Sequence, residues 1–360
     1  MSNNVFLPLF LVLLLLGQLT LFGCKPVPPS EGFAGLGATA DEFAQVVPGN
    51  VIEYPAALDQ HPEYRIEWWY VTANLQTEFG EPLGIQWTLF RYADAPAPQR
   101  EGWASQQRWL GHVGLTRANH HFFADTYARG GINQAGVSPE PFNAWIDNWS
   151  FIATDTDATH FTLHADTADF SYALTLKKQG PAILHGEQGV SVKSSAGQAS
   201  YYLSLPFLAV SGEIKIGDEQ LAVTGDAWLD REWSSQPLAA NQLGWDWFSL
   251  HLANGDKLML FRLRHADAEH YFSGTYIPAD GRTQPLQSQQ ITMQPIQQHS
   301  VAGKRVPVAW QLTVADLGIA IQARALNPNA WMGTGIAYWE GPINFTGSHS
   351  GKGYLEMTGY

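Results

Sequence analysis

The sequence predicts an all-β protein built from two related antiparallel β domains in tandem. Two aromatic segments, residues 68–75 and 245–252, read as near copies, and each precedes a second apolar run that ends in Phe-Arg, at Arg91 and Arg262. Many short runs alternate apolar and polar residues between Gly, Asn and Asp turn signals, which is typical of antiparallel sheets. No long stretch has a competing helical period.

The repeat continues towards the end of each half. Residues 210–214 precede Val-Thr-Gly at 223–225, and residues 339–343 precede Met-Thr-Gly at 357–359. Two matches in the same order indicate a domain duplication, because solenoid repeats recur at much shorter periods.

The expected strands follow the chain in order. Closed or sandwich-like antiparallel structure fits their number and spacing, and the aromatic content favours barrels. The first half is expected to contain strands at 67–75, 84–91, 111–116, 122–128, 149–153, 159–165, 170–177, 200–205, 213–216 and 221–228. The second half is expected to contain strands at 245–252, 257–264, 271–278, 290–295, 308–314, 319–325, 331–340 and 353–360.

The N-terminus has the features of a lipoprotein signal peptide over residues 1–23. An apolar run at 5–16 is shorter than a membrane span, and Leu-Phe-Gly-Cys ends at Cys24, the only cysteine. We expect Cys24 to carry a lipid; an ordinary signal peptide with an incidental cysteine is the alternative. Lys25 follows, with no Asp to signal inner-membrane retention, so the expected location is the cell envelope, facing the periplasm from the outer membrane.

The remaining chain divides into a flexible tether over residues 24–45 and two domains over 46–240 and 241–360, with a Pro- and Ser-containing hinge between them. The formal net charge is −13, which disfavours nucleic acid as a partner because phosphates are repelled. Fourteen Trp and thirteen Tyr fit either packed barrel cores or an aromatic cavity for an apolar ligand.

The densest polar and aromatic cluster lies at residues 225–234, at the end of the first half. If the strand there continues, alternation places Trp228, Asp230 and Glu232 on one face. Buried carboxyl groups of raised pKa suit a general acid, so Asp230 and Glu232 are the catalytic candidates. The alternative is a structural ion pair, in which Arg231 holds a carboxylate and Trp233 packs beneath it.

Further ligand-binding candidates lie in the aromatic repeat. They are Glu67 and Trp69 in the first copy and Trp245, Asp246 and Trp247 in the second. Trp228, Arg231 and Trp233 of the cluster at 225–234 are ligand-binding candidates as well. Asp246 alternates with its two tryptophans and is expected to point away from them. Arg91 and Arg262 end equivalent strands, so we interpret them as scaffold residues in buried salt bridges.

Several familiar chemistries have no support in the sequence. There is no His-Glu-x-x-His pair, no Gly-x-Ser-x-Gly elbow and no phosphate-binding glycine loop. His112 lies in an apolar run and is typical of a core histidine rather than a ligand. We therefore expect no metal and no cofactor.

Three motifs together resemble one family. Residues 67–70 (Glu-Trp-Trp-Tyr), 230–234 (Asp-Arg-Glu-Trp-Ser) and 244–248 (Gly-Trp-Asp-Trp-Phe) are similar to those of bacterial carotenoid 1,2-hydratases and AttH-like secreted proteins, over roughly residues 45–360. The resemblance implies two lipocalin-like barrels and a hydrophobic ligand. In the hydratases an acid protonates an isoprenoid double bond and water adds.

The chain departs from the hydratase branch at two places. The hydratases have Asp-His-Asn-Trp where this chain has Asp230-Arg231-Glu232-Trp233, and no carboxylate lies near Phe261-Arg262, where their catalytic aspartate would align. Arginine cannot usefully release a proton. The resemblance therefore favours the secreted branch, whose members are expected to work beside ABC-type exporter components.

Three functional hypotheses follow from the sequence. The leading one is an envelope lipoprotein that binds a hydrophobic or lipid-like molecule as an accessory to an ABC-type exporter. The second is a cofactor-free hydro-lyase in which Asp230 or Glu232 protonates an alkene. The third is an interaction module whose tryptophans are all core. Any site is expected at the junction between the two barrels.

Overall fold

The computed structural model describes residues 42–96, 100–236 and 241–360. The signal peptide, Cys24 and most of the tether expected from the sequence lie outside these residues. The described chain is almost entirely β-structure, with single turns of 3-10 helix at Ala56–Leu58, Gly102–Ala104, Ser288–Gln290 and Ala315–Leu317. None of its helices is long and apolar enough to cross a membrane.

Two curled antiparallel sheets divide the strands between them. The first has the order β4-β3-β2-β1-β13-β12-β9-β8-β7-β6-β5, and β10 and β11 also pair with β12. Its strands are β1 (Ile66–Thr77), β2 (Pro82–Ala93), β3 (Gln107–Arg117), β4 (His121–Arg129), β5 (Ala135–Pro139), β6 (Phe142–Ile146), β7 (Trp149–Ala153), β8 (His160–Asp166), β9 (Phe170–Lys178), β10 (Ile183–Leu184), β11 (Val190–Val192), β12 (Ala199–Ile216) and β13 (Glu219–Ser234).

The second sheet has the order β17-β16-β15-β14-β23-β22-β20-β19-β18, and β21 also pairs with β22. Its strands are β14 (Gln242–Leu252), β15 (Lys257–His265), β16 (Tyr271–Ile277), β17 (Gln284–Leu286), β18 (Ile291–Val301), β19 (Lys304–Val314), β20 (Ile319–Ala325), β21 (Trp331–Met332), β22 (Tyr338–Gly347) and β23 (Gly351–Met357). The all-β expectation, with two lipocalin-like barrels in tandem, is confirmed.

The two sheets share one topology. The orders β3-β2-β1-β13-β12-β9 and β16-β15-β14-β23-β22-β20 correspond strand for strand, and β5 and β6 extend only the first sheet. Pairing fixes the equivalence, because Glu67 lies opposite Arg91 and Asp246 lies opposite Arg262. Aligning the two copies, 68–75 and 245–252, places Trp69 against Asp246. The register instead matches Glu67 with Asp246, a shift of two residues that keeps each side chain on its face.

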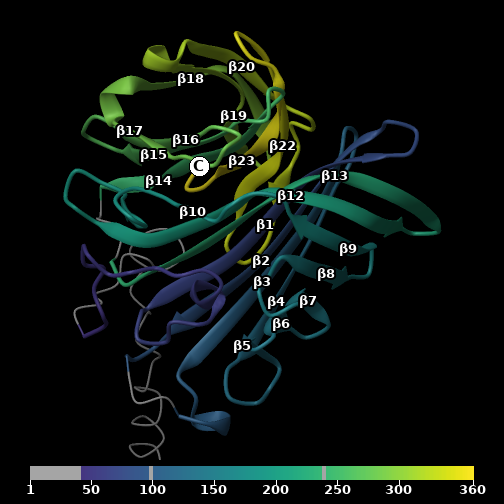
Figure 1. The fold of residues 1–360 in the computed structure, drawn as a ribbon. Helices are drawn as coiled ribbons and strands as arrows, with labels where there is room; N and C mark the ends of the chain where they lie inside the picture. Colours follow the sequence, from purple (N-terminus) through teal and green to yellow (C-terminus); the bar gives the residue numbers. More distant parts are fainter. Residues whose placement is uncertain (1–41, 97–99, 237–240) are drawn as a thin grey trace, which may run out of the picture.

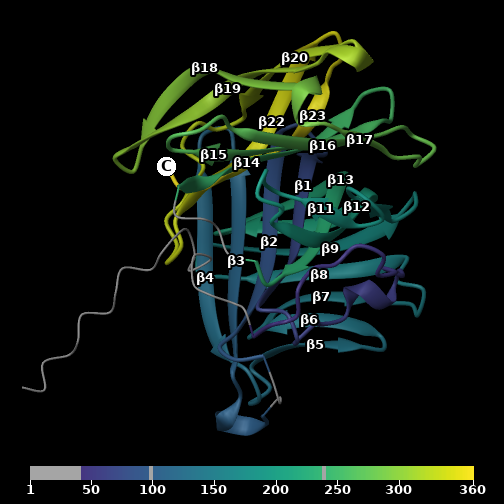
Figure 2. The ribbon, with the colours of Figure 1, turned by 90° about the vertical axis from the view of Figure 1, so that its left-hand side faces the viewer.

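Each barrel interior is filled by its own apolar core, and a third cluster lies between the barrels. The first core centres on β1, β2, β8 and β9, and the second on β14, β15, β19 and β20. The third joins Tyr70, Tyr202 and Trp228 of the first barrel to Trp247 and Phe261 of the second. Figures 1 and 2 show the second sheet lying across the long strands of the first.

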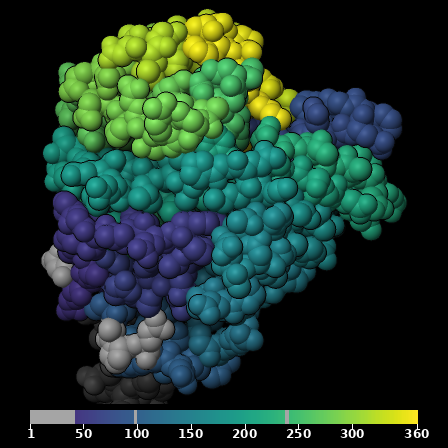
Figure 3. Space-filling view, in the orientation of Figure 1, coloured from purple at the N-terminus to yellow at the C-terminus, as the bar shows by residue number. Residues whose placement is uncertain are grey.

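The barrels pack through equivalent faces. Strands β1 and β2 contact β23 and β22, and Trp247 of β14 meets Trp228 of β13 in an edge-to-face contact. Asn74 donates a hydrogen bond to the carbonyl of Gly353 at 2.9 Å, and Asn327 donates one to Arg117 at 3.0 Å. In Figure 3 the green and yellow second half sits directly on the first half.

Candidate functional site

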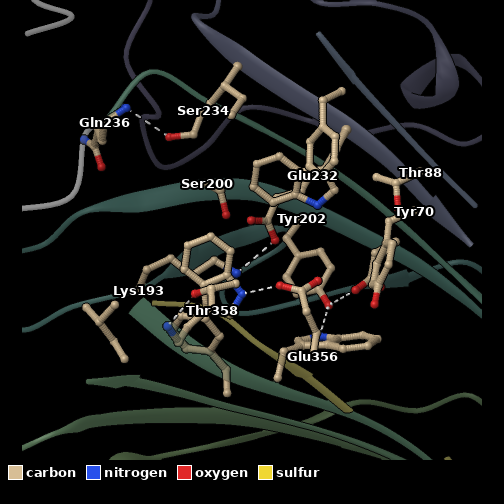
Figure 4. Close-up of a pocket in the computed structure, with 18 of the residues that line it drawn as sticks. Tyr70, Thr88, Lys193, Ser200, Tyr202, Glu232, Ser234, Gln236, Glu356 and Thr358 are labelled. Atoms are coloured by element: carbon tan, nitrogen blue, oxygen red, sulfur yellow. Dashed lines mark hydrogen bonds and ion pairs between the residues drawn. The ribbon is translucent and has the colours of Figure 1, made fainter. Parts of the chain in front are cut away.

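A cavity lies between the two barrels, not inside either one. The cavity has a volume of about 150 Å³, and residues of both halves line it. Figure 4 shows polar groups from both barrels around this space, among them Lys193, Glu232 and Glu356. Its aromatic lining consists of Trp68, Tyr70, Phe90, Tyr92, Tyr202, Trp245, Trp247, Phe261 and Tyr338.

One wall is the outer face of the first sheet. His112, Thr88, Tyr70 and Asp230 lie directly opposite one another on β3, β2, β1 and β13, so their side chains form one row across the sheet. The next row along the same face holds Phe90, Trp68 and Glu232 with Tyr202. Alternation along each strand keeps these side chains on the face away from the barrel core.

The other wall is the equivalent face of the second sheet. Trp247 lies opposite Phe261 on one side and Glu356 on the other, and Glu356 lies opposite Glu340. Trp245 and Thr358 continue this wall towards the end of the chain. A carboxylate thus stands beside a tryptophan in both walls.

Three hydrogen bonds hold the carboxyl group of Asp230 in the cavity wall. Its Oδ1 accepts hydrogen bonds from Trp228 Nε1 at 2.6 Å and from the Ser204 hydroxyl, and its Oδ2 accepts one from the Tyr202 hydroxyl at 2.6 Å. Burial raises the pKa of Asp230 to about 7, even though these three hydrogen bonds favour its charged form. The group can therefore both release and retake a proton near neutral pH.

Glu232 differs because it has a cation beside it. Lys193 Nζ donates to Glu232 Oε2 at 2.9 Å and lies 4.2 Å from the centre of the Tyr202 ring. Burial raises the pKa of Glu232, and the charge of Lys193 opposes that rise. Lys193 is the only lysine or arginine that lines the cavity in the described chain, so Glu232 is the cavity carboxylate best able to stay ionised.

Glu356 and Glu340 form a second acidic group on the opposite wall. Trp245 Nε1 donates to Glu356 Oε1 at 2.7 Å, and the Tyr70 hydroxyl donates to Glu340 Oε1 across the junction. Burial raises the pKa of Glu356 to about 7, and burial together with the charge of Glu356 raises the pKa of Glu340 well above its usual value. Near neutral pH a substantial fraction of Glu356, like Asp230, is therefore protonated.

Several residues proposed from the sequence do line the cavity. Asp230, Glu232, Trp245 and Trp247 contribute directly to its surface. Trp228 does not line it but lies beneath Asp230 as a hydrogen-bond donor. The strand β13 does continue through residues 230–234, so the conditional argument from alternation applies to this segment.

Other proposed site residues lie on the opposite faces, in two buried ion clusters. Glu67 pairs with both Arg91 and Arg231, and Arg231 lies 4.0 Å from the Trp69 ring and 4.9 Å from the Trp233 ring. The two arginines hold the pKa of Glu67 well below its usual range although burial alone would raise it. None of these five residues lines the cavity.

Asp246 is the equivalent carboxylate of the second barrel. It pairs with Arg262 at 2.7 Å and with Arg264 at 3.5 Å, and it accepts a hydrogen bond from the Tyr360 hydroxyl at 2.7 Å. It points away from Trp245 and Trp247, which lie on the cavity side. The alternative considered for this motif, a structural ion pair in which Arg231 holds a carboxylate with Trp233 packed against it, is what the contacts of Arg231 show, and the carboxylate is that of Glu67.

Sequence reasoning missed Glu356, Glu340, Lys193, Tyr70 and Tyr202. Glu356 could have been found from the repeat. If Glu67 is aligned with Asp246, Trp68 corresponds to Trp247, and their partners on the neighbouring strands, Glu232 and Glu356, then correspond to each other. Lys193 had no such signal, since it arrives from the loop after β11. Among the described residues no group of His, Cys, Asp and Glu side chains is arranged to hold a metal ion.

The comparisons with known proteins agree with this architecture. Residues 45–360 match the AttH-like family. This chain belongs to the AttH-like family. The resemblance inferred from its three motifs is thereby confirmed at the family level.

Solved structures extend the comparison of this AttH-like chain. A crystal structure of an AttH protein from Nitrosomonas europaea is 36% identical, with a TM-score of 0.80, and the match covers 88% of this chain and 99% of that one. Kievitone hydratase from Nectria haematococca has 15% identity and a TM-score of 0.67, covering 88% and 96%. CghA in complex with Sch210972 has 13% identity and a TM-score of 0.52, covering 90% and 97%. The last two likenesses concern the fold alone. A search of curated proteins finds no match.

Proposed function

We propose that this AttH-like protein binds a small, largely apolar molecule in the cavity between its barrels and adds water to a carbon–carbon double bond, or removes it. The observation that carries this proposal is Asp230, an acid with a pKa of about 7 that lines an aromatic cavity and is fixed by three donors. A passive apolar pocket has no need of several buried carboxyl groups, which cost free energy to bury.

The proposed step needs one acid and one base. Asp230 gives its proton to one alkene carbon, and the positive charge that develops on the other carbon faces the rings of Trp245 and Trp247. A water molecule forms the new carbon–oxygen bond and gives its extra proton to Glu232. That proton then returns to Asp230, so the sum is one water added.

Geometry supports this division of roles. Asp230 and Glu232 lie two residues apart on one face of β13, which separates them by about 7 Å and leaves room for a reacting carbon and a water. Lys193 helps keep Glu232 ionised, whereas Asp230 has no such cation and can stay protonated. General acid–base catalysis of this kind contributes about 10²–10⁴-fold in rate.

The experiment uses a lipid extract of the source cells as substrate, in water enriched in ¹⁸O. We expect the protein to form products that gain one H₂¹⁸O, detected by mass spectrometry, and Asp230→Asn to form at least 100-fold less. Asp267→Asn, an exposed substitution, serves as the matched control. Identical product spectra for the protein and Asp230→Asn would exclude the proposed chemistry.

A carrier without catalysis is the second candidate, favoured by the predominantly aromatic lining of the cavity. In that proposal the protein is lipid-anchored at Cys24, faces the periplasm from the outer membrane, and hands a hydrophobic or lipid-like molecule to ABC-type exporter components. The support for the anchor is the sequence Leu-Phe-Gly-Cys at residues 21–24. Native mass spectrometry of protein from its own membranes tests it: a co-purifying lipid with unchanged structure after incubation favours the carrier.

A further inference from the structure

His112 is a buried polar side chain in the cavity wall that the proposed chemistry does not use. Only 1% of its surface is exposed, it lines the cavity, and its Nε2 has no hydrogen-bond partner. Buried polar atoms are hydrogen-bonded in the great majority of cases, so each exception calls for a partner or a purpose.

The orientation of the His112 ring is fixed. Its Nδ1 lies 3.0 Å from the Tyr338 hydroxyl, its ring stacks on that of Tyr338 at 5.6 Å, and Phe90 meets it edge-on at 5.5 Å. Tyr338 comes from the second barrel, so both halves hold the ring. The ring is therefore held in one orientation, and in that orientation Nε2 has no hydrogen-bond partner within the protein.

The state of the ring limits what it can bind. Burial lowers the pKa of His112 to about 4, so the imidazole is neutral at pH 7 and Nε2 carries no charge to attract an anion. A neutral imidazole nitrogen is either a donor or an acceptor, depending on the tautomer. A hydroxyl group satisfies both cases because it can accept and donate.

The position of His112 relative to the acid follows from the strand register. His112, Thr88, Tyr70 and Asp230 form one row over four neighbouring strands, which places His112 about 14 Å from Asp230 at roughly 4.8 Å per strand. Phe90 and Trp68 lie in the adjoining row. An apolar body can therefore extend along the wall between the acid and the histidine.

We infer that the molecule bound in this cavity is an apolar alcohol or phenol whose hydroxyl group hydrogen-bonds to His112 Nε2, at the end of the row opposite Asp230. His112 is in this inference a residue that determines specificity. The inference rests on the proposed function only in needing an apolar ligand in the cavity. It does not depend on whether Asp230 transfers a proton.

The test compares two probes of nearly equal shape, 2-naphthol and 2-methylnaphthalene, by equilibrium dialysis. The quantity measured is the ratio of their affinities in the protein, divided by the same ratio in His112→Phe. This quotient cancels the different solubilities of the probes. If one buried hydrogen bond is lost in His112→Phe, this quotient should be about five to ten. His121→Phe is the matched control: His121 is a neighbouring histidine on β4 that bonds to Thr116 and does not line the cavity, and its quotient should be one.

A measurement on the unaltered protein guards against a folding defect in His112→Phe. The ¹⁵N resonance of His112 Nε2 should shift on addition of 2-naphthol and stay in place on addition of 2-methylnaphthalene. If both probes bind and neither the quotient nor the resonance changes, the assignment of His112 is wrong while the apolar site stands. If neither probe binds, the proposed ligand site itself is wrong, and this inference falls with it.

Discussion

Glu232 and Glu356 occupy equivalent positions in the two halves of the chain. Each lies directly opposite a tryptophan on the neighbouring strand, Trp68 for Glu232 and Trp247 for Glu356, and both line the same cavity. Their surroundings then diverge, because Glu232 has Lys193 beside it and Glu356 has Glu340. The repeated fold thus places two equivalent carboxyl groups in one cavity, and their different neighbours give them different tendencies to ionise.

Asp230→Asn should stabilise the protein by about 4 kcal/mol at pH 8 and by only about 2 kcal/mol at pH 5. Burial raises the pKa of Asp230 from 3.8 to about 7, so the folded state binds the proton more tightly, and wild-type stability falls as the pH rises from about 4 to about 7 and levels off above it. The asparagine removes that dependence. The gain at pH 8 is on the order of 4 kcal/mol.

The measurement for Asp230→Asn is urea unfolding at both pH values. Asp267→Asn, at an exposed position, controls for the general effect of removing a negative charge. An equal change at pH 5 and pH 8 would mean that the carboxyl of Asp230 is not the titrating group.

Lys193→Met should raise the pKa of Glu232. Burial already raises that pKa, and the ammonium group at 2.9 Å is the main influence that opposes the rise. ¹³C NMR titration of the Glu232 carboxyl, assigned with Glu232→Gln, measures the shift. Lys178→Met removes a lysine that also lies over a tyrosine ring, at 5.1 Å from Tyr54, and should leave the titration of Glu232 unchanged. A fall or no change in Lys193→Met would contradict the assignment.

Arg231→Met should unfold more easily but bind ligand normally once folded. Arg231 and Arg91 share the buried carboxylate of Glu67, and removing one partner of a buried ion pair costs about 3–5 kcal/mol. Chemical denaturation measures the loss, and affinity for 2-naphthol at low denaturant measures the site. Arg282→Met, which breaks an exposed pair with Asp280, should have almost no effect. A large loss of affinity in Arg231→Met with intact folding would place Arg231 in the site after all.

Gly84→Ala should weaken the junction between the barrels. A Cβ atom at Gly84 of β2 would lie 2.5 Å from Cγ of Pro342 in β22 of the other barrel, so β2 or β22 must shift. Overpacking of this kind costs about 1–3 kcal/mol. Thermal or chemical unfolding of Gly84→Ala, Pro342→Ala and the double variant forms the test. The double variant should recover part of the loss because the clashes with Cγ and Cδ of Pro342 are removed and only the contact with Cβ, at 2.8 Å, remains, whereas purely additive losses would show that these residues do not touch.

The sequence predicted most strands and the face on which Asp230 and Glu232 lie, because alternation is a local property. It predicted separate strands at 200–205 and 213–216, but β12 runs from Ala199 to Ile216 with a register shift between Leu205 and Leu208. A shift of this kind lets one strand pass a proline and continue. The expected strand at 331–340 is in fact the short β21 and the start of β22.

The candidate site was only half visible in the sequence, for physical reasons. Asp230 and Glu232 lie in a conspicuous motif, whereas Glu356 and Glu340 are single acidic residues in ordinary strands. Their burial results from the packing of one barrel on the other, and no local pattern encodes that packing. His112 reads as a core histidine in its apolar strand, and only the second barrel turns the outer face of that strand into a cavity wall.

The equal faces through which the barrels meet carry a consequence for how such a pocket can arise. Two separate copies of one barrel, docked face to face by a two-fold axis, would present the same wall twice, and any lysine placed beside one glutamate would appear beside the other. Both glutamates would then have the same surroundings and the same tendency to ionise. Joining the copies in a single chain removes that constraint. Lys193 can then lie beside Glu232 and help keep it ionised, while no other lysine or arginine of the described chain lines the cavity near Glu356. Covalent linkage is thus what allows two equivalent residues to have different neighbours.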